Sequence, residues 1–390
     1  MKVLHISNKP IYPLVDGGCV AMANMLTNLS TIADQIQHVC INTPKHPFKA
    51  EVYPIDVVTP FFPEHTFIDT NPKVLPALTA LITGSNYNLK RFYKRSVEAQ
   101  FIKHIQHEQF DVIVLESLFL TGYIPAIRTI SDATIVVRAH NVEHELWEQQ
   151  ATETSNFIKK WYLNSLAKSL KKAEIKQLNQ ADQVWTITQE DALKLAALEV
   201  KKPIYTIPVA LETPNQTADY SQTDFFHLGS LNWAPNQLAI KTLTDDYWPK
   251  LSDQTTSQLH IAGSFSESIT LKEQKGIVFH GFVEDATQFM CSHGILVSPV
   301  RTGSGVRIKL LEALSLGVPC ITTTLGSVGI DPLAEVLILA NSSEEWINAM
   351  LHLAQSQESR MHLGEKAKRY MEKYHSFAAV NAQIKRSLGK

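Results

Sequence analysis

Short apolar runs alternate with longer, helix-like segments in the first half of the chain. The runs are rich in Val, Ile and Leu, and they occupy residues 3–7, 112–116, 134–138 and 184–188. The first run is followed by a loop with prolines and glycines and then by a segment, 20–29, with helical periodicity. Uninterrupted apolar runs are typical of strands buried on both faces, and their alternation with helices predicts a parallel sheet.

A second series of such runs fills the rest of the chain. Its members are residues 225–229, 259–262, 277–279, 295–298, 320–323 and 336–339. The polar, turn-rich segment 212–219 separates the two series and predicts an interdomain connection. We therefore expect an α/β protein with two doubly wound domains, 1–212 and 213–375, and a C-terminal helix, 376–390, that packs back toward the first domain.

Composition and charge narrow the function classes. The 390 residues are enough for two cores, and 44% of them are hydrophobic. The 36 basic and 38 acidic residues nearly cancel, which argues against a nucleic-acid partner held by bulk charge. The four cysteines are widely spaced and lack a Cys-x-x-Cys pattern, and no apolar run is long enough to span a bilayer. These features favour the cytoplasm.

Two basic segments depart from this neutral average. They are residues 90–95 and 156–176, and the second carries six lysines interleaved with Phe157, Trp161 and Tyr162. A basic amphipathic helix with aromatic residues can lie on an anionic membrane surface. The alternative is an ordinary solvated helix face. The pattern leaves both readings open, including a peripheral position on the inner face of a membrane.

Residues 298–319 are the most informative segment of the chain. They predict a strand end, a turn containing Gly303-Ser304-Gly305, a helix, and a stop at Gly317-Val318-Pro319. Glycines allow close backbone approach, and the N–H groups at a helix start favour an anion such as a diphosphate.

If the helix began at Gly305, Lys309 and Glu312 would lie about 40° and about 20° from it, on one face. A cation suits phosphate and a carboxylate suits vicinal ribose hydroxyls, so this face suits a nucleotide sugar. Arg307 would then lie on the opposite, packing face, unless the first turn is irregular. The alternative is a plain glycine turn with a surface Lys/Glu pair.

This segment resembles the donor-binding signature of the retaining family 4 glycosyltransferases (glycosyl transferases group 1). Other motifs follow in the family's order: the glycine pair Gly17-Gly18 after the first strand, residues 138–143 after a middle strand, Gly229-Ser230, and residues 279–283. The resemblance implies the GT-B fold, in which two Rossmann-like domains face each other across a cleft. The first domain would bind the acceptor and the second the nucleotide sugar.

The resemblance assigns roles to particular residues. Gly17 and Gly18 match a first-domain glycine loop near the donor diphosphate, and His140 matches a histidine that touches the donor sugar near its anomeric centre. His140 also follows a strand end, where open α/β sheets bind ligands. We therefore name His140 as a catalytic candidate, with Lys309 as the second.

In the second domain, Gly229 and Ser230 match the start of the family's phosphate loop, and Glu312 matches the carboxylate that holds the ribose. The segment with His280, Phe282 and Val283 matches the lining of the nucleobase. Together with Gly303, Ser304, Gly305, Arg307 and Lys309, these residues complete the predicted donor site.

Two positions depart from the family pattern. Many relatives carry a glutamate where this chain has Ser304, and a lysine after the second-domain loop where this chain has Asn236. The resemblance includes a branch with a Gly-Ser-Gly-x-Arg-x-Lys pattern, in which Arg307 or Lys309 would supply the positive charge.

The chain contains no Asp-x-Asp motif, so the sequence predicts neither a bound metal nor a cofactor other than the donor substrate itself. The leaving diphosphate would then be stabilised by helix N–H groups and cations. We expect a metal-independent retaining hexosyltransferase that acts by front-face substitution on an acceptor hydroxyl, in a glycan, a lipid-linked substrate or a small molecule, as in polysaccharide biosynthesis.

Two alternatives remain: a non-catalytic sugar-nucleotide-binding partner subunit, motivated by Ser304 and Asn236, and a nucleotide-sugar epimerase of the same fold. A nicotinamide dehydrogenase is disfavoured because Gly-x-Gly-x-x-Gly does not follow the first strand. Residues 61–93 are expected to shape the choice of acceptor.

Overall fold

The computed structural model describes residues 1–53, 59–60, 66–73, 75–76, 79–80, 85–212, 214–270, 272–303 and 305–390. The chain forms two compact units. The N-terminal unit consists of Met1–Val209 with Asn381–Lys390, and the C-terminal unit consists of Ala210–Val380. The last helix, α15 (Phe377–Ser387), therefore begins in the C-terminal unit and continues in the N-terminal unit.

A parallel sheet forms the centre of the N-terminal unit. Its strands, in the spatial order β3-β2-β1-β4-β5-β6-β7, are β3 (Thr59–Pro60), β2 (Gln35–Cys40), β1 (Lys2–Ser7), β4 (Val112–Glu116), β5 (Thr134–Ala139), β6 (Gln183–Thr186) and β7 (Ile204–Thr206). The chain runs outward from β1 to β3 and then returns to β4. The switch point of the sheet, where ligands bind in open α/β folds, therefore lies between β1 and β4.

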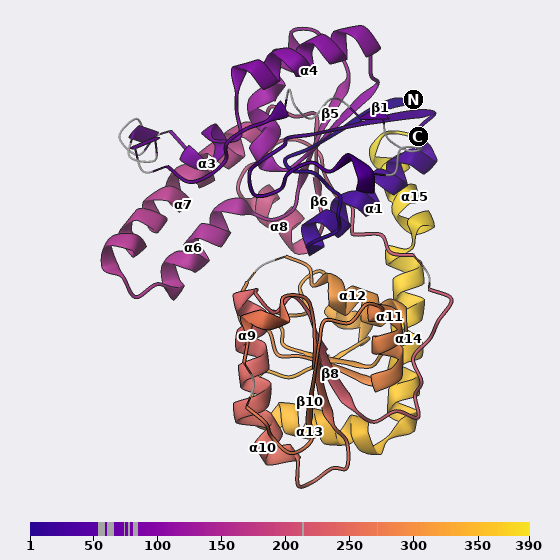
Figure 1. The fold of residues 1–390 in the computed structure, drawn as a ribbon. Helices are drawn as coiled ribbons and strands as arrows, with labels where there is room; N and C mark the ends of the chain where they lie inside the picture. Colours follow the sequence, from indigo (N-terminus) through magenta and orange to yellow (C-terminus); the bar gives the residue numbers. More distant parts are fainter. Residues whose placement is uncertain are drawn as a thin grey trace. The chain divides into compact units, whose positions relative to one another are not determined.

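Helices cover both faces of this sheet (Figure 1). They are α1 (Gly17–Ile32), α3 (Tyr87–Lys90), α4 (Arg95–Glu108), α5 (Ile124–Arg128), α6 (Glu143–Glu153), α7 (Phe157–Leu178) and α8 (Gln189–Ala197), with 3₁₀ turns η1 (Ala50–Val52) and η3 (Leu118–Tyr123).

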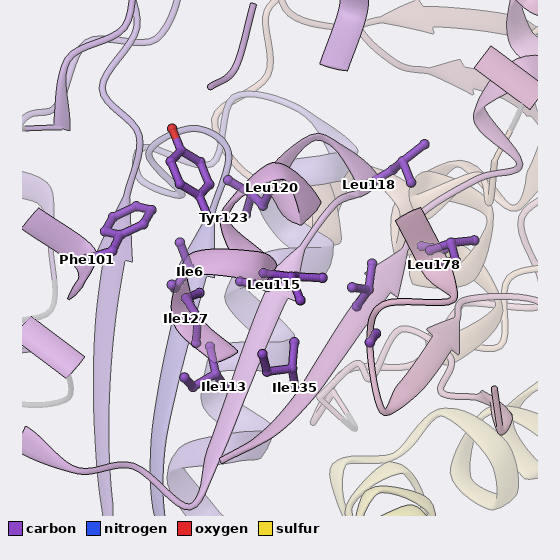
Figure 2. Packing of buried hydrophobic residues seen from close by; sticks show 14 of the residues in the cluster. Ile6, Phe101, Ile113, Leu115, Leu118, Leu120, Tyr123, Ile127, Ile135 and Leu178 are labelled. Atoms are coloured by element: carbon purple, nitrogen blue, oxygen red, sulfur yellow. The ribbon is translucent and has the colours of Figure 1, made fainter. Parts of the chain in front are cut away.

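Alternate strand residues build the main core of this unit. Ile6, Ile113, Leu115 and Ile135 point to one face, where they meet side chains of α4, η3, α5 and α7, as Figure 2 shows. The other face meets α1, where Nη1 of Arg138 donates to the carbonyl of Ala21 at 3.1 Å. Both faces are covered, which explains why the strands read as continuous apolar runs.

The C-terminal unit repeats this plan. Its parallel sheet has the order β10-β9-β8-β11-β12-β13, with its switch point between β8 and β11. The strands are β8 (Phe225–Leu228), β9 (Leu259–Ala262), β10 (Ile277–Gly281), β11 (Ile295–Ser298), β12 (Cys320–Thr322) and β13 (Ile338–Leu339).

The helices of this unit also lie on both faces of their sheet (Figure 1). They are α9 (Ala234–Lys241), which continues through the π-helical η4 (Thr242–Tyr247) into α10 (Trp248–Leu251), then α11 (Ala286–His293), α12 (Ile308–Ser315), α13 (Ser343–Gln355) and α14 (Gln357–His375), with 3₁₀ turns η5 (Ser266–Ser268) and η6 (Pro332–Ala334). Segment 234–251 and α13 pack on one face through large buried side chains that include Trp248 and Trp346.

The predicted strands agree closely with those of the structure, and the differences have local causes. The predicted strand 184–188 ends at Thr186, because Thr188 caps α8 by accepting a hydrogen bond from the N–H of Asp191. β2 and β7 were not predicted: polar residues such as Gln35 and Gln37 interrupt the apolar pattern of β2, and β7 has three residues.

The four cysteines form no disulfide. In the described part of the chain, none of the helices combines the length and the hydropathy that crossing a membrane would require.

Candidate functional site

Two loops meet at the switch point of the C-terminal sheet. One follows β8 and begins with Gly229 and Ser230, and the other follows β11 and contains Gly303 and Gly305. A Cβ atom on Gly303 would lie 3.1 Å from the Trp233 ring and 3.2 Å from Pro235, so the second loop packs directly on the first. The two glycine motifs that the sequence singled out are thus brought together.

Each loop needs glycine for a different reason. Gly303 and Gly305 have φ of 88° and 77°, a backbone conformation that L side chains rarely adopt. Gly229 has no such φ, but a Cβ there would lie 2.4 Å from Nδ2 of Asn236. Ser304 lies outside the described residues.

Both helices that follow these loops begin without a capping side chain. The N-cap residues are Trp233 for α9 and Arg307 for α12, neither makes a side-chain cap hydrogen bond, and neither helix has an acidic residue in its first turn. By contrast, α11 and α13 are capped by Asp285 and Ser342. Uncapped N–H groups and the positive end of a helix dipole favour an anion, so the start of α12 suits a phosphate.

The residue at which the helix was expected to begin was wrong. α12 begins at Ile308 and not at Gly305, because Gly305 has a positive φ and Arg307 has φ −83° and ψ 94°. Val306 also precedes the helix, whereas Leu310, Ala313 and Leu314 lie within it and are buried.

Arg307 therefore does not pack against the sheet as a helical residue. Its Nη2 donates to the carbonyls of Gly303 (3.0 Å) and Thr302 (3.3 Å), and its guanidinium lies 5.2 Å from the centre of the Trp233 ring. Burial lowers the pKa of Arg307 to about 10, so the group remains charged at neutral pH. Arg307 thus fixes the glycine turn and places a positive charge beside it.

Lys309 and Glu312 share the exposed side of the first turns of α12, as predicted. In the structure they bond to each other, with 2.7 Å between Nζ and Oε2, and their side chains are 45% and 27% exposed. Both groups are accessible to solvent, and their bond would have to break before either side chain could bind a ligand.

Asn236 has a structural role where the family carries a lysine. It is buried, and its Nδ2 donates to the carbonyl of Ser230 at 3.0 Å. The hydroxyl of Ser230 bonds to Asn232 at 2.9 Å and lies at the surface of the loop. Asn236 thus shapes the loop after β8 and supplies no charge to it.

The segment predicted to line the nucleobase follows β10. The Phe282 side chain is 66% exposed, Val283 is half-buried, and the His280 ring turns toward His260, with 2.8 Å between His280 Nε2 and His260 Nδ1. The loops after β8, β9 and β10 are joined by backbone bonds from Gly229 to Ala262 and from Gly263 to Gly281.

In the N-terminal unit, polar side chains form a row across four strands of the apolar sheet. His38, His5, Glu116 and Arg138 come from β2, β1, β4 and β5 and are all buried. The strand register places Ser7 beside Glu116 and Glu116 beside Arg138, so the row lies at the carboxyl end of the sheet, at its switch point. His140, just after β5, completes the cluster.

The carboxylate of Glu116 holds this cluster together. It accepts from Nε2 of His5 (2.9 Å), from Nη1 of Arg138 (3.2 Å to both oxygens) and from Nε2 of His140 (2.5 Å). Burial alone would raise the pKa of Glu116, but the charge of Arg138 and the bonds from both histidines hold it well below its usual range. Glu116 is thus a buried, ionised anchor.

Glu116 determines which nitrogen of His140 remains for a ligand. A carboxylate accepts hydrogen bonds, so Nε2 of His140 is the donor and Nδ1 is the free ring nitrogen. The His140 side chain is 18% exposed. Sequence reasoning missed Glu116, although a carboxylate at the end of an entirely apolar strand is a signal that could have found it.

The segment after His140 is fixed from a neighbouring helix. α6 has no side-chain cap of its own, and Glu174 of α7 accepts from the N–H groups of Glu143 (2.8 Å) and His144 (3.3 Å). Burial and the nearby Glu174 raise the pKa of Glu143 to about 8, so Glu143 is mostly protonated at neutral pH. Glu143 in the predicted motif therefore serves packing.

Gly17 and Gly18 do not form a loop, which corrects the sequence-based interpretation. They are the first two residues of α1, and the N-cap Asp16 accepts from the N–H of Cys19 at 2.8 Å. Burial alone would raise the pKa of Asp16, but Lys9, 2.6 Å away, and the Cys19 bond lower it to about 2. The start of α1 thus carries its own carboxylate, unlike the start of α12.

Part of the C-terminal unit matches the model of a known protein family. Residues 222–356 match the family model described as glycosyl transferases group 1. No curated protein sequence matches the chain. The match covers most of the C-terminal unit and includes the loops after β8 and β11. The family resemblance predicted from the sequence is confirmed there.

Solved structures resemble the whole chain. HepE of Anabaena in complex with UDP has 13% identity and a TM-score of 0.69, and the match covers 100% of both chains. HepE in complex with UDP-glucose has 12% identity and a TM-score of 0.64, and the match covers 100% of this chain and 99% of that chain. Sucrose-phosphate synthase from Thermosynechococcus elongatus has 13% identity and a TM-score of 0.67, covering 100% of this chain and 98% of its own. The fold is therefore GT-B, as predicted.

Removal of the Glu116 anchor should destabilise the N-terminal unit. Glu116→Ala leaves the Arg138 guanidinium buried without a carboxylate, which costs about 3–5 kcal/mol. Because the folded pKa of Glu116 is depressed, its stabilisation is present above the unfolded pKa of about 4.3 and is lost as the pH falls through the folded value. Urea unfolding at pH 7 and at lower pH measures both effects.

Glu145→Ala is the matched control, because Glu145 pairs with Lys194 at the surface. Its cost should stay below about 1 kcal/mol. Equal losses of unfolding free energy in the two variants would contradict the anchor role of Glu116.

Proposed function

We propose that the chain transfers a hexosyl group from a nucleotide diphosphate sugar to an acceptor hydroxyl with retention of configuration, because residues 222–356 match the family model described as glycosyl transferases group 1. The observation that carries this proposal is the start of α12, where a glycine turn, an uncapped helix and Lys309 meet. HepE is in complex with UDP and UDP-glucose, which makes a uridine diphosphate sugar the first donor to test.

The proposal assigns donor binding to residues 213–375 and acceptor binding to residues 1–212. The N–H groups at the start of α12, with Gly229, Ser230 and Lys309, bind the diphosphate. Glu312 accepts from the ribose hydroxyls once its bond to Lys309 is released. His280, Phe282 and Val283 line the nucleobase.

Chemically, the departing diphosphate gains negative charge as the glycosidic bond breaks. A helix start and two cations, Lys309 and Arg307, stabilise that charge without a bridging metal. His140 acts on the transferred sugar through Nδ1, held in place by Glu116. The acceptor hydroxyl attacks from the face that the diphosphate leaves, and a phosphate oxygen takes its proton.

A second candidate function is a non-catalytic partner subunit that binds sugar nucleotides. The buried Asn236 favours it, because the phosphate loop there lacks the lysine of the family pattern. The third candidate is an epimerase of the same fold.

The function test uses the purified full chain with UDP-glucose and a panel of other nucleotide sugars, in the presence of EDTA. A glycosyltransferase should release the nucleoside diphosphate slowly without acceptor, and added Mg²⁺ in excess over EDTA should leave the rate unchanged. Tight binding without release would identify the partner subunit, and a changed sugar still attached to the nucleotide would identify the epimerase. A Mg²⁺-dependent rate would overturn the metal-independent step.

Two substitutions should separate donor binding from turnover. Lys309→Ala removes a charge-assisted phosphate contact of about 1.5–3 kcal/mol, which lowers kcat/KM about 10- to 150-fold. His140→Ala should lower kcat more than it raises KM. Steady-state kinetics measures both, with Lys241→Ala, an exposed lysine at the end of α9, as control. A Lys309 variant equal to that control would remove Lys309 from the site.

We further propose that the start of α7 contacts an anionic membrane. Phe157, Ile158 and Trp161 are 81%, 76% and 58% exposed, and the neighbouring Lys159 and Lys160 are also exposed. A solvated helix face does not need three adjacent exposed apolar side chains, whereas a bilayer would bury them and attract the lysines.

The variant Phe157→Ser/Trp161→Ser should lose binding to vesicles that contain phosphatidylglycerol, because its apolar contact is gone. Cosedimentation measures the bound fraction, and binding of the wild type should fall with salt. Leu193→Ser, at an exposed leucine of α8, is the control and should bind as the wild type does. Equal binding of all three proteins would contradict this role of α7.

A further inference from the structure

Three histidines from three elements converge on one side of the C-terminal sheet. They are His260 on β9, His280 on β10 and His293 at the end of α11. One side-chain nitrogen from each lies within 4.8 Å of the other two. The His260 and His293 ring centres are 4.2 Å apart, and those of His280 and His293 are 5.5 Å apart.

Hydrogen bonds outside the cluster fix two of the rings. Nε2 of His260 faces Oδ2 of Asp224 at 3.3 Å, and Nδ1 of His293 donates to the carbonyl of Phe289 at 2.7 Å. These contacts leave Nδ1 of His260 and Nε2 of His293 as unprotonated nitrogens when the rings are neutral. Metal-binding histidines are commonly held in this way, with the second nitrogen bonded to a carboxylate or a backbone carbonyl.

The third ring is placed by an irregularity in β10. The register with β9 shifts between Phe279 and Gly281, so His280 is the extra residue of a bulge. A bulge leaves its extra residue without a strand partner and can redirect its side chain. Here the His280 ring reaches His260, with 2.8 Å between Nε2 and Nδ1.

The surroundings suit a bound ion. His260 is buried, His293 is half-buried and His280 is exposed, so solvent reaches the cluster from one side. The neutral imidazole is the form that binds metal.

We propose that His260, His280 and His293 bind one divalent transition-metal ion, with Zn²⁺ as the best match, and leave a fourth position open to water. Three imidazoles suit Zn²⁺, whereas Mg²⁺ and Ca²⁺ prefer oxygen ligands. Nitrogens about 2.0–2.1 Å from a tetrahedral Zn²⁺ are about 3.3 Å apart, so His260 and His280 need to separate only slightly. The site shares His280 with the segment that the proposed function places along the nucleobase, but the metal ion itself takes no part in the transfer step.

The competing explanation is a direct hydrogen bond between His280 and His260. It accounts for the 2.8 Å contact, but it gives no role to the nitrogen of His293 that the Phe289 carbonyl leaves available. A metal ion uses all three rings. The two explanations therefore differ at His293.

The test titrates EDTA-treated, desalted full chain with Zn²⁺ by calorimetry and with Co²⁺ by visible absorption. We expect one Zn²⁺ per chain, a raised Tm, and cobalt bands typical of a four-coordinate site. His293→Gln and the more exposed His280→Gln should each weaken Zn²⁺ binding more than about 100-fold. Asp224→Asn, which alters the partner of His260 Nε2 but removes no ligand, should weaken it about 10- to 100-fold with unchanged stoichiometry.

His362→Gln, at an exposed histidine of α14, is the control and should bind as the wild type does. Circular dichroism of each variant without metal checks that it is folded. Absence of stoichiometric binding to the wild type, or wild-type binding by folded His293→Gln and His280→Gln, would overturn the proposal.

Discussion

A parallel sheet places the starts of the helices that follow neighbouring strands at one edge, and the candidate donor site depends on this constraint. In the C-terminal unit the switch point between β8 and β11 brings together the loops that precede α9 and α12. Because both helices lack a capping side chain, their N–H groups are the natural partners of an anion. The contact of Gly303 with Trp233 and the bonds of Arg307 to the turn hold this edge in shape before any ligand arrives.

The N-terminal unit uses the same edge of its sheet differently. The start of α1 is already occupied by the carboxylate of Asp16, which Lys9 neutralises. Its polar groups come instead from the strands of the sheet, where Glu116 accepts hydrogen bonds from Arg138, His5 and His140. A buried carboxylate is costly unless it is paired, so the cluster is satisfied only when all its members are in place. The two units thus share a fold but offer different chemistry: backbone N–H groups in one and a fixed imidazole in the other.

The fold could be predicted from the sequence because most strands of the two sheets are buried on both faces and appear as apolar runs, whereas β2 and β7 lack such a run. The turn with Gly303 and Gly305 could be predicted as well, since few other residues adopt its backbone conformation, whereas the predicted loop at Gly17 and Gly18 was wrong. The start of α12 could not be predicted, because the contact of the Arg307 guanidinium with the Trp233 ring joins residues that are distant in the sequence. The bonds of Arg307 to the carbonyls of Thr302 and Gly303 then hold the turn that precedes the helix. Glu116 was missed for a related reason, because its partners lie on strands distant in sequence.

His280 belongs both to the predicted nucleobase lining and to the proposed metal site. The family resemblance predicts that His280 lines the nucleobase. The bulge in β10, however, leaves His280 without a partner on β9, and its ring lies against His260. If a metal ion holds that ring, Phe282 is the side chain of this segment best able to stack on a base, because it is 66% exposed. The ion would then act on the donor site indirectly, by fixing the backbone at Gly281, whose carbonyl already bonds to Gly263 in the loop after β9. Recognition of the base would then depend on how rigidly the segment after β10 is held, and the imidazole of His280 would bind the metal ion.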